Sequence, residues 1–377
     1  AEDGIRDLVR SRGLGDVYKR QAIEDYLFSI ANPADHEVFL YDVTSTYLEG
    51  MQNELAAFGY NRDGKKGKMQ LVVGLLTDST GIPLSVQVFE GNTQDPKTFK
   101  DQIKKVAERF KAKGVTFVGD RGMIKSREIE EIAGEEFHYI TAITKAQVES
   151  LLVKGVFQMN LFDDFLSEVF HDGVRYVLRR NPVRAEEMAM TRQSKIQSLQ
   201  NHVEKLNKYL TDHPRGKPET AKRKLNAKIQ KYKMKKCVSV ETLNRGFSLN
   251  LNETELQKAA KLDGCYVIKS DLVLGEISKE FIHDRYKDLA EVEKAFRTMK
   301  TGFLELRPVN VRLSNRTRAH VFVVMLAYRI TQEFKTAWID HNYTVEEGIE
   351  LLASICTMQV WVKQKPCFQR IPMPRDD

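Results

Sequence analysis

Short apolar runs separated by polar turns open the patterned part of the chain. Val38 to Asp42 has the pattern of a buried strand that ends on a carboxylate, and residues 69–77 and 82–89 are further runs rich in Val and Leu. The segment Asp78-Ser-Thr-Gly81 between the last two has residues that favour a hairpin turn. The pattern predicts three strands, the second and third joined as a β-hairpin.

Helical and extended patterns alternate beyond this hairpin. A helix is expected over about 95–111, a fourth strand over 115–118 with Asp120 just past its end, a short helix over 124–132 and a fifth strand over 138–144. The order β-β-β-α-β-α-β predicts an α/β fold with a ribonuclease H-like core. Such a core is a mixed five-stranded sheet flanked by helices.

The stretch 145–282 is too long for a connection inside a compact domain, so it must have structure of its own. Its first part has strand patterns, and a second part, 183–236, has helical ones. Apolar residues there recur at steps of three and four, as in a heptad seam: Ile196, Leu199, Val203, Leu206 and Leu210. After a break at Asp212 to Pro218, Leu225, Ile229 and Tyr232 share the face of a second helix. A large insertion of strands plus an antiparallel helical hairpin is therefore predicted.

Residues 284–300 contain no Gly or Pro and are dense in good helix formers. Tyr286, Glu293 and Lys300 lie seven residues apart, which is nearly two turns, so one continuous helix would present all three on one side. A solvated amphipathic helix also scatters charges along its surface. The spacing alone leaves a functional and a structural role open.

The C-terminal region continues with helical patterns. A long apolar helix is expected over about 318–335, and Thr344 to Glu347 has the residues of a capping box that opens another helix. Residues 366–377 are expected to form an extended tail. Asp95, at the start of the earlier helix over 95–111, is expected to act as its N-cap, with Pro96 in the first helical position.

The first residues, Ala1 to Gln21, have mixed charge without apolar periodicity and resemble translated adapter sequence, so they are expected to be a non-native leader. A genuine flexible leader is the alternative. The expected division of the chain is the following: leader 1–21, remnant of an N-terminal region 22–37, first part of the core 38–144, insertion 145–282 with its basic hairpin 183–236, last part of the core 283–338, and C-terminal helices and tail 339–377.

Composition narrows the class of protein. The 377 residues are 42% hydrophobic and 29% charged, as in an ordinary soluble chain with one large or two medium cores. The four cysteines lie far apart without a C-x-x-C pair, so neither a disulfide framework nor a zinc site is expected and a reducing cytoplasm fits. No apolar run reaches the ~20 residues that span a bilayer, and no signal peptide opens the chain. A membrane partner is not expected.

Positive charge is concentrated in one region. The net charge is +7, yet residues 181–240 hold fifteen Lys or Arg against five Asp or Glu. Such a stripe is typical of a surface that binds nucleic-acid phosphate, although a solvated helical hairpin would show it too. The loop from Arg62 to Lys68 is a second basic cluster, in which Lys65, Lys66 and Lys68 could contact a DNA backbone or simply face solvent. It lacks the spacing of a nucleotide-binding loop, so no nucleotide cofactor is expected.

Several motifs occur in a fixed order between Val38 and Ile330: YDVTSTYLEG around Asp42, GNTQDPKTF after the hairpin, FVGDRGM around Asp120, YKDLAEVEKAFRTMK around Glu293, then GFLELRPV and RAHVFVVMLAYRI. Together they resemble the DDE-type transposases of bacterial insertion sequences, in the group with a tyrosine, arginine, glutamate and lysine signature. The resemblance implies that Asp42, Asp120 and Glu293 are the catalytic, metal-binding triad.

The resemblance also implies DNA contacts beside the triad. Tyr286 and Lys300 would contact phosphate near the cleavage site, and Arg121 is a further candidate. The signature's arginine falls on Leu289, so its contact is either absent or supplied by one of three neighbours: Arg285, Lys287 or Arg297. Arg297 is taken as the DNA-contact candidate among them.

The chemistry explains why carboxylates are needed. Two divalent ions about 4 Å apart stabilise the attacking and leaving oxygens of a phosphodiester displacement. Mg²⁺ requires hard oxygen ligands, so two Mg²⁺ ions, with Mn²⁺ as a substitute, are the expected cofactors. The expected reaction is cut-and-paste transposition, in which hydrolysis frees a 3′-hydroxyl at the element's end and that hydroxyl attacks target DNA.

The resemblance implies double-stranded DNA as the partner, at element ends and target, a homodimer on DNA, and a bacterial cytoplasmic location at the nucleoid. Two alternatives remain: a ribonuclease H-like nuclease without strand transfer, and an inactive DNA-binding remnant. In the family a DNA-recognition domain precedes the first aspartate by more residues than precede Asp42 here, so weak sequence-specific binding is expected.

Overall fold

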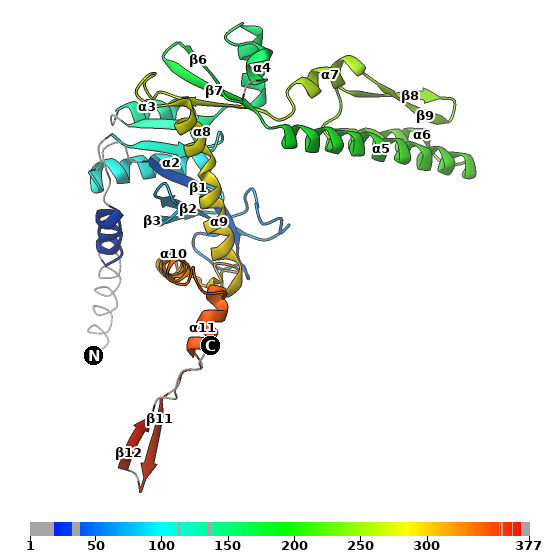
Figure 1. The fold of residues 1–377 in the computed structure, drawn as a ribbon. Coiled ribbons are helices and arrows are strands. Elements are labelled where there is room, and N and C mark those ends of the chain that lie inside the picture. The colour runs from blue at the N-terminus through cyan, green and yellow to red at the C-terminus, as the bar shows by residue number, and fades with distance from the viewer. Residues whose placement is uncertain are drawn as a thin grey trace. The chain divides into compact units, whose positions relative to one another are not determined.

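The computed structural model describes residues 19–31, 38–111, 114–134, 137–163, 165–353, 355, 357–363 and 365–370. The chain divides into two compact units, one of residues 1–141 and 284–377 and the other of residues 142–283. Figure 1 shows the elements of both units along the chain. The proposed leader falls almost entirely outside the described residues.

The first unit is built on a mixed sheet in the order β3-β2-β1-β4-β5. Its strands are β1 (Val38–Tyr47), β2 (Gln70–Thr77), β3 (Pro83–Glu90), β4 (Thr116–Gly119) and β5 (His138–Ala142). β1, β2 and β3 pair antiparallel, whereas β4 pairs parallel with both β1 and β5. This is ribonuclease H-like topology, so the predicted α/β fold class is confirmed.

The helices of this part of the chain are α2 (Asp95–Lys104), α3 (Ser126–Gly134), α8 (Lys279–Lys287), α9 (Leu289–Lys300), α10 (Ser314–Ala337) and α11 (Val345–Ala353). Phe99 of α2 packs against Tyr41 of β1 and Phe117 of β4, with ring centroids 5.7 and 5.4 Å apart. α9 packs on β1, and α10 packs on β3. The aromatic core between α2 and the sheet thus fixes the central strands, on which α9 rests from the other side.

The second unit has an antiparallel sheet and a long helical hairpin. The strands β6 (Ser167–His171), β7 (Val174–Arg180) and β10 (Cys265–Ser270) pair in the order β10-β7-β6. The other elements are α4 (Lys145–Val153), a 3-10 turn (Met159–Phe162), α5 (Pro182–Asp212), α6 (Pro218–Lys231), β8 (Val238–Leu243), β9 (Gly246–Leu251) and α7 (Glu253–Lys261).

The predicted heptad seam holds the hairpin together. Leu199 of α5 and Leu225 of α6 are fully buried, and both belong to one core cluster with Ile196, Val203, Leu210 and Ile229. Leu206 and Tyr232 are only partly buried against that cluster. Burial of an apolar stripe explains why these 31- and 14-residue helices pair along their length.

Four predicted elements differ in the structure. β1 does not end at Asp42 but continues to Tyr47, because Thr44 and its neighbours pair with β2. The helix predicted over 284–300 begins at Lys279 and is interrupted at Asp288, which gives α8 and α9. The helix over 95–111 ends as an α-helix at Lys104 and continues to Arg109 as a π-helical turn.

The C-terminal tail is the fourth difference, since β11 (Met358–Val362) and β12 (Lys365–Arg370) form a β-hairpin, while residues 371–377 lie outside the described residues. The capping box at Thr344 is confirmed, because Thr344 Oγ1 accepts a hydrogen bond from the Glu347 N–H at 3.2 Å and the Glu347 carboxylate accepts one from the Thr344 N–H at 2.7 Å.

Residues 19–31 form one helix, which runs through the position of the predicted leader boundary at Gln21. The buried carboxylate of Glu24 accepts a hydrogen bond from Arg109 at 2.6 Å, and Arg109 also donates to the Gln21 carbonyl. Residues 19–21 therefore belong to the folded unit. Among the described residues, no helix combines the length and apolar character needed to cross a membrane.

Candidate active site

Strand register brings the first two acidic residues of the triad together. The parallel pairing of β1 with β4 runs from Val38↔Thr116 to Tyr41↔Gly119. Asp42 and Asp120 are the next residue on each strand, so they follow the last pair at the same edge. Neighbouring strands lie about 4.8 Å apart, which makes these two carboxylates neighbours although 78 positions separate them in the chain.

Side-chain alternation directs Asp42 towards α9. Tyr41 points into the aromatic core under α2, where its hydroxyl donates to the Thr98 carbonyl at 3.4 Å. Successive residues of a strand face opposite sides of a sheet, so Asp42 and Thr44 lie on the other face. Both line a pocket that α9 covers.

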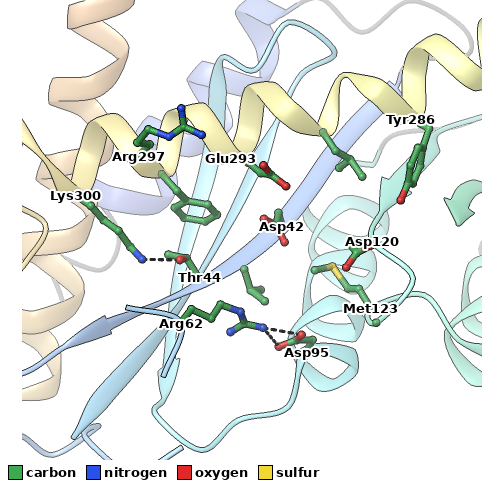
Figure 2. Close-up of a pocket in the computed structure, with 14 residues that line it drawn as sticks. Asp42, Thr44, Arg62, Asp95, Asp120, Met123, Tyr286, Glu293, Arg297 and Lys300 are labelled. Atoms are coloured by element: carbon green, nitrogen blue, oxygen red, sulfur yellow. Dashed lines mark hydrogen bonds and ion pairs between the residues drawn. The ribbon is translucent and has the colours of Figure 1, made fainter. Parts of the chain in front are cut away.

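The acidic residue of α9 reaches the same pocket. Val292, Ala295, Phe296 and Met299 are buried and hold the apolar side of α9 on the sheet. This packing leaves Glu293, Arg297 and Lys300 along the pocket, which has a volume of about 510 Å³. Figure 2 shows the Asp42, Asp120 and Glu293 side chains directed into it from β1, the end of β4 and α9.

The three carboxylates repel one another. The pKa of Asp42 is raised to about 7, mainly by burial and also by the nearby carboxylates of Asp120 and Glu293, against the lowering effects of the Val43 N–H and Arg62. Among the described residues, none of the three forms an ion pair. The Asp120 carboxylate accepts a hydrogen bond from the Arg121 N–H at 2.8 Å. The three carboxylates therefore share one pocket, and none of them is neutralised by a direct ion pair among the described residues.

Two other carboxylates near the pocket are neutralised. Arg62 donates to both oxygens of Asp95 at 2.7 Å. Lys300 donates to Asp63 at 2.8 Å and to Thr44 at 2.7 Å, and Arg307 donates to the same Asp63 oxygen at 2.7 Å. Burial lowers the pKa of Lys300, and Asp63 opposes that effect. Asp63 is only 3% exposed, and its second oxygen is buried with no hydrogen-bond partner in the described residues.

The structure separates the DNA-contact candidates into two groups. Tyr286, Arg297 and Lys300 line the pocket together with the three carboxylates. Arg121 and the loop lysines do not: Lys68 pairs with Glu49 at 2.8 Å, and Lys65 lies over the Tyr47 ring at 5.5 Å from its centroid. Lys66 is exposed.

The position of the missing signature arginine is also resolved. Leu289 lines the pocket, so no charged group enters it from that position. Of the three basic neighbours, Arg297 is the one that lines the pocket, whereas Arg285 pairs with Asp288 at 3.0 Å.

Some pocket residues escape prediction from sequence. Thr44 lies two residues after Asp42, and strand alternation would have placed it on the same face had β1 been predicted to continue. Asp95 is not an N-cap, because α2 is capped by Gln94 without a side-chain hydrogen bond and Asp95 pairs with Arg62 instead. Asp63 and Arg62 carry no local signal beyond their place in a basic loop.

The donor set suits a hard divalent cation. The pocket offers carboxylate oxygens and no histidine or cysteine. Within the described residues, no three His, Cys, Asp or Glu side chains are grouped closely enough to hold one ion. Mg²⁺ is commonly held by one or two carboxylates, with waters and substrate phosphates completing its shell. The pocket fits ions bound in that manner.

Fold and pocket define an α/β protein of the ribonuclease H-like class with an acidic pocket at the ends of its central parallel strands. The chain belongs to the family described as the transposase DDE domain, whose model matches residues 33–330. No curated protein matches the chain.

Two solved structures show a distant likeness. One is a cryo-EM structure of a piggyBac transposase synaptic complex with hairpin DNA, with 7% identity and a TM-score of 0.42 over 83% of this chain and 50% of that chain. The other is the Mos1 transposase paired-end complex with the left transposon end, with 9% identity and a TM-score of 0.21 over 33% of this chain and 41% of that chain. This chain thus spans half or less of either protein.

Proposed function

We propose that this chain is the catalytic part of a DNA transposase that cuts DNA at element ends and joins the freed 3′ ends to target DNA. Asp42, Asp120 and Glu293 would hold the divalent ions. One observation carries the proposal: in a member of the transposase DDE family, three carboxylates from distant segments line one pocket without a cationic partner among the described residues.

The electrostatics of the pocket support a central place for Asp42 in this proposal. Its carboxylate is influenced by both Asp120 and Glu293, so it is the group best placed to share an ion with each of them. When bound, two Mg²⁺ ions, or Mn²⁺ in their place, would stabilise the attacking and departing oxygens of a phosphodiester. Divalent ions would also relieve the carboxylate repulsion that burial strengthens.

The cations of the pocket would position the DNA backbone. Lys300 uses hydrogen bonds to Thr44 and Asp63 to fix its ammonium, and a third donor remains for a phosphate oxygen. Arg297 borders the pocket near Glu293. Its planar guanidinium group could bind a phosphate there through two parallel hydrogen bonds. Tyr286 would contact the backbone from the α8 end of the pocket.

The substrate would be double-stranded DNA, at element ends and at the target, and the reaction would follow the cut-and-paste course. Hydrolysis would first expose a 3′-hydroxyl, which would then attack target DNA. A homodimer would join two element ends on DNA. Nothing in the pocket provides the glycine-rich loop of a nucleotide-binding site, so no nucleotide cofactor is proposed.

The test compares two glutamates of one helix. Glu293 lines the pocket, whereas Glu291 pairs with Lys294 at 3.0 Å and does not line it. We expect Glu293→Gln to abolish Mg²⁺-dependent nicking of supercoiled plasmid and joining of 3′-hydroxyl ends, with Glu291→Gln close to the parent. Equal activity of the two variants would remove Glu293 from the site.

Two further measurements separate the alternatives. Asp120→Asn should lose nicking but keep salt-sensitive DNA binding, because binding depends mainly on phosphate contacts. Nicking without any joining of 3′-hydroxyl ends would show a nuclease instead of a transposase. A parent chain that binds DNA but neither nicks nor joins it would show an inactive remnant.

A further inference from the structure

The α5–α6 hairpin carries a cluster of lysines with no acidic partner. Its members are Lys195, Lys205, Lys224, Lys228 and Lys231, called here the hairpin lysine cluster. On α5, Lys195 and Lys205 lie ten residues apart, about 80° short of three full turns, so their side chains lie within a quarter turn of each other. On α6, Lys228 follows Lys224 by four residues and precedes Lys231 by three. Among the described residues, no carboxylate pairs with any of the five.

Contacts between α5 and α6 fix one lysine of the cluster, Lys228, beside the Tyr232 ring. Lys228 donates to the Ser198 carbonyl at 2.9 Å and lies over the Tyr232 ring at 5.6 Å from its centroid. The Tyr232 and Ser198 hydroxyls hydrogen-bond at 3.0 Å. The Lys228 ammonium is thereby fixed between α5 and α6, although these contacts leave it without a counter-charge.

The electrostatics agree with this geometry. Burial lowers the pKa of His202, and Lys228, Lys205 and Lys224 lower it further. The hydrogen bond from Ser198 lowers the pKa of Tyr232, and Lys228, Lys231 and Lys195 act in the same direction. Lysines alone supply the charges that act on these two groups. The region is therefore strongly positive and favours an anion.

A groove beside the cluster has the chemistry to receive that anion. It has a volume of about 340 Å³ and is lined by Lys205, Lys228 and His202 with uncharged polar side chains such as Ser198 and Asn201. Neither a carboxylate nor an apolar side chain lines it. Amide and hydroxyl groups beside lysines are the usual donors to nucleic-acid phosphates, and the groove offers no apolar pocket for a peptide side chain.

We propose that the hairpin lysine cluster and its groove form a second DNA-binding surface, separate from the acidic pocket, that holds the phosphate backbone of duplex DNA without reading its sequence. The 31 residues of α5 extend over about 45 Å, and a duplex carries one negative charge per ~1.7 Å, so several phosphates can lie along the hairpin at once. Choosing DNA as the polyanion rests on the proposed function.

The experiment uses the full chain and a 30-base-pair DNA duplex of arbitrary sequence in EDTA, with affinity followed by fluorescence anisotropy from 50 to 300 mM NaCl. The variant is the triple substitution Lys195→Gln, Lys205→Gln and Lys224→Gln. Each phosphate contact contributes about 0.9 to the slope of log affinity against log salt, so we expect the slope to fall by about 2 to 3. Affinity at 100 mM NaCl should fall at least about tenfold.

A matched control removes the same charge from the same unit. Lys154→Gln, Lys258→Gln and Lys261→Gln replace exposed lysines outside the hairpin and should leave the slope near that of the parent. Thermal unfolding by circular dichroism should give both triple variants a midpoint no more than about 2 °C below that of the parent. An equal fall of slope in the control, or an unchanged slope in the hairpin variant, would overturn the proposal.

Two arms identify the ligand and separate this proposal from the first. A 30-base-pair RNA duplex that binds the cluster more tightly than DNA would overturn the assignment to DNA. Asp120→Asn should bind DNA in EDTA with the slope of the parent, because the surface lies outside the acidic pocket. Failure of nicking in Mg²⁺ would count against the proposed function, while the slope difference measured in EDTA would still decide the binding surface.

Discussion

The paired cations at the pocket and the lysines of the α5–α6 hairpin have opposite surroundings. Lys300 and Arg62, which line the pocket, and the nearby Arg307 each contact a carboxylate, at Asp63 or Asp95. The hairpin lysine cluster has no such partner among the described residues. Paired cations are fixed in position and help to shape a site, whereas unpaired ones repel each other and favour a bound anion. We therefore expect the first group to fix the geometry of the pocket and the second to attract an anion.

The acidic triad of the pocket is the negative counterpart of the hairpin cluster. Asp42, Asp120 and Glu293 line one cavity without an ion-pair partner among the described residues, near two carboxylates, Asp95 and Asp63, that do form ion pairs. Like charges gathered in a partly buried site oppose folding, and such arrangements are typical of functional sites. Under the two proposals, the acidic pocket would bind divalent cations and the hairpin lysine cluster would bind phosphate.

The largest effect should follow removal of an unpaired carboxylate. Asp42→Asn should lower the rate of Mg²⁺-dependent nicking by about 1000-fold or more, because metal ions contribute several kcal/mol to such reactions. A time course on supercoiled plasmid measures it. A variant within tenfold of the parent would contradict the role of Asp42.

The next largest effect concerns the paired carboxylate Asp63. Asp63→Ala leaves Lys300 and Arg307 without their common partner in a site where Lys300 is 10% exposed, so the free energy of unfolding should fall by about 3 kcal/mol. The exposed pair of Glu49 with Lys68 is the control, since Glu49→Ala should cost less than about 1 kcal/mol. Urea unfolding measures both. Equal losses would show that burial does not distinguish the pairs.

The ionised Asp42 carboxylate should also lower the free energy of unfolding, although its proposed function requires it. Its pKa is raised from an ordinary value near 4 to about 7, so the folded state retains a proton that the unfolded state loses, and stability falls as pH rises from about 4 to 7. In EDTA at pH 8, Asp42→Asn should therefore raise the free energy of unfolding by an amount on the order of 2 kcal/mol. Near pH 4 the gain should vanish. A gain that is independent of pH would refute this cause.

The smallest effect concerns the unpaired lysines. Lys224 and Lys228 are like charges four residues apart on α6, so Lys224→Gln should raise the free energy of unfolding by about 0.3 kcal/mol at low salt. The gain should disappear in 0.5 M NaCl, where surface charges are screened. A loss of stability would indicate that Lys224 has a partner in solution.

Local patterns predicted the sheet and the hairpin because their signals are periodic. The apolar runs of β1 to β5 and the seam from Ile196 to Leu210 each specify a buried face. The extent of β1 was missed, since Thr44 to Thr46 are polar and become strand only by pairing with β2. The break at Asp288 was missed because the sequence around it contains no helix-breaking residue.

The pocket was predictable only in part, for a similar reason. Asp42, Asp120 and Glu293 stand within motifs, and strand order places two of them at one edge. Asp63 contacts Lys300 across more than 200 positions of the chain, and Arg62 contacts Asp95 across more than 30. No local sequence pattern encodes such contacts. The missing signature arginine at Leu289 was visible in the sequence, but the choice of Arg297 over Arg285 required the structure.

The central claim is that the three carboxylates hold divalent ions, and crystallography with Mn²⁺ tests it most directly. Anomalous difference maps of crystals soaked in MnCl₂ should show ions in the pocket, with oxygens of Asp42 and of Asp120 or Glu293 about 2.1 to 2.2 Å away. A pocket without anomalous density at saturating Mn²⁺, in a protein that still nicks DNA, would contradict the claim.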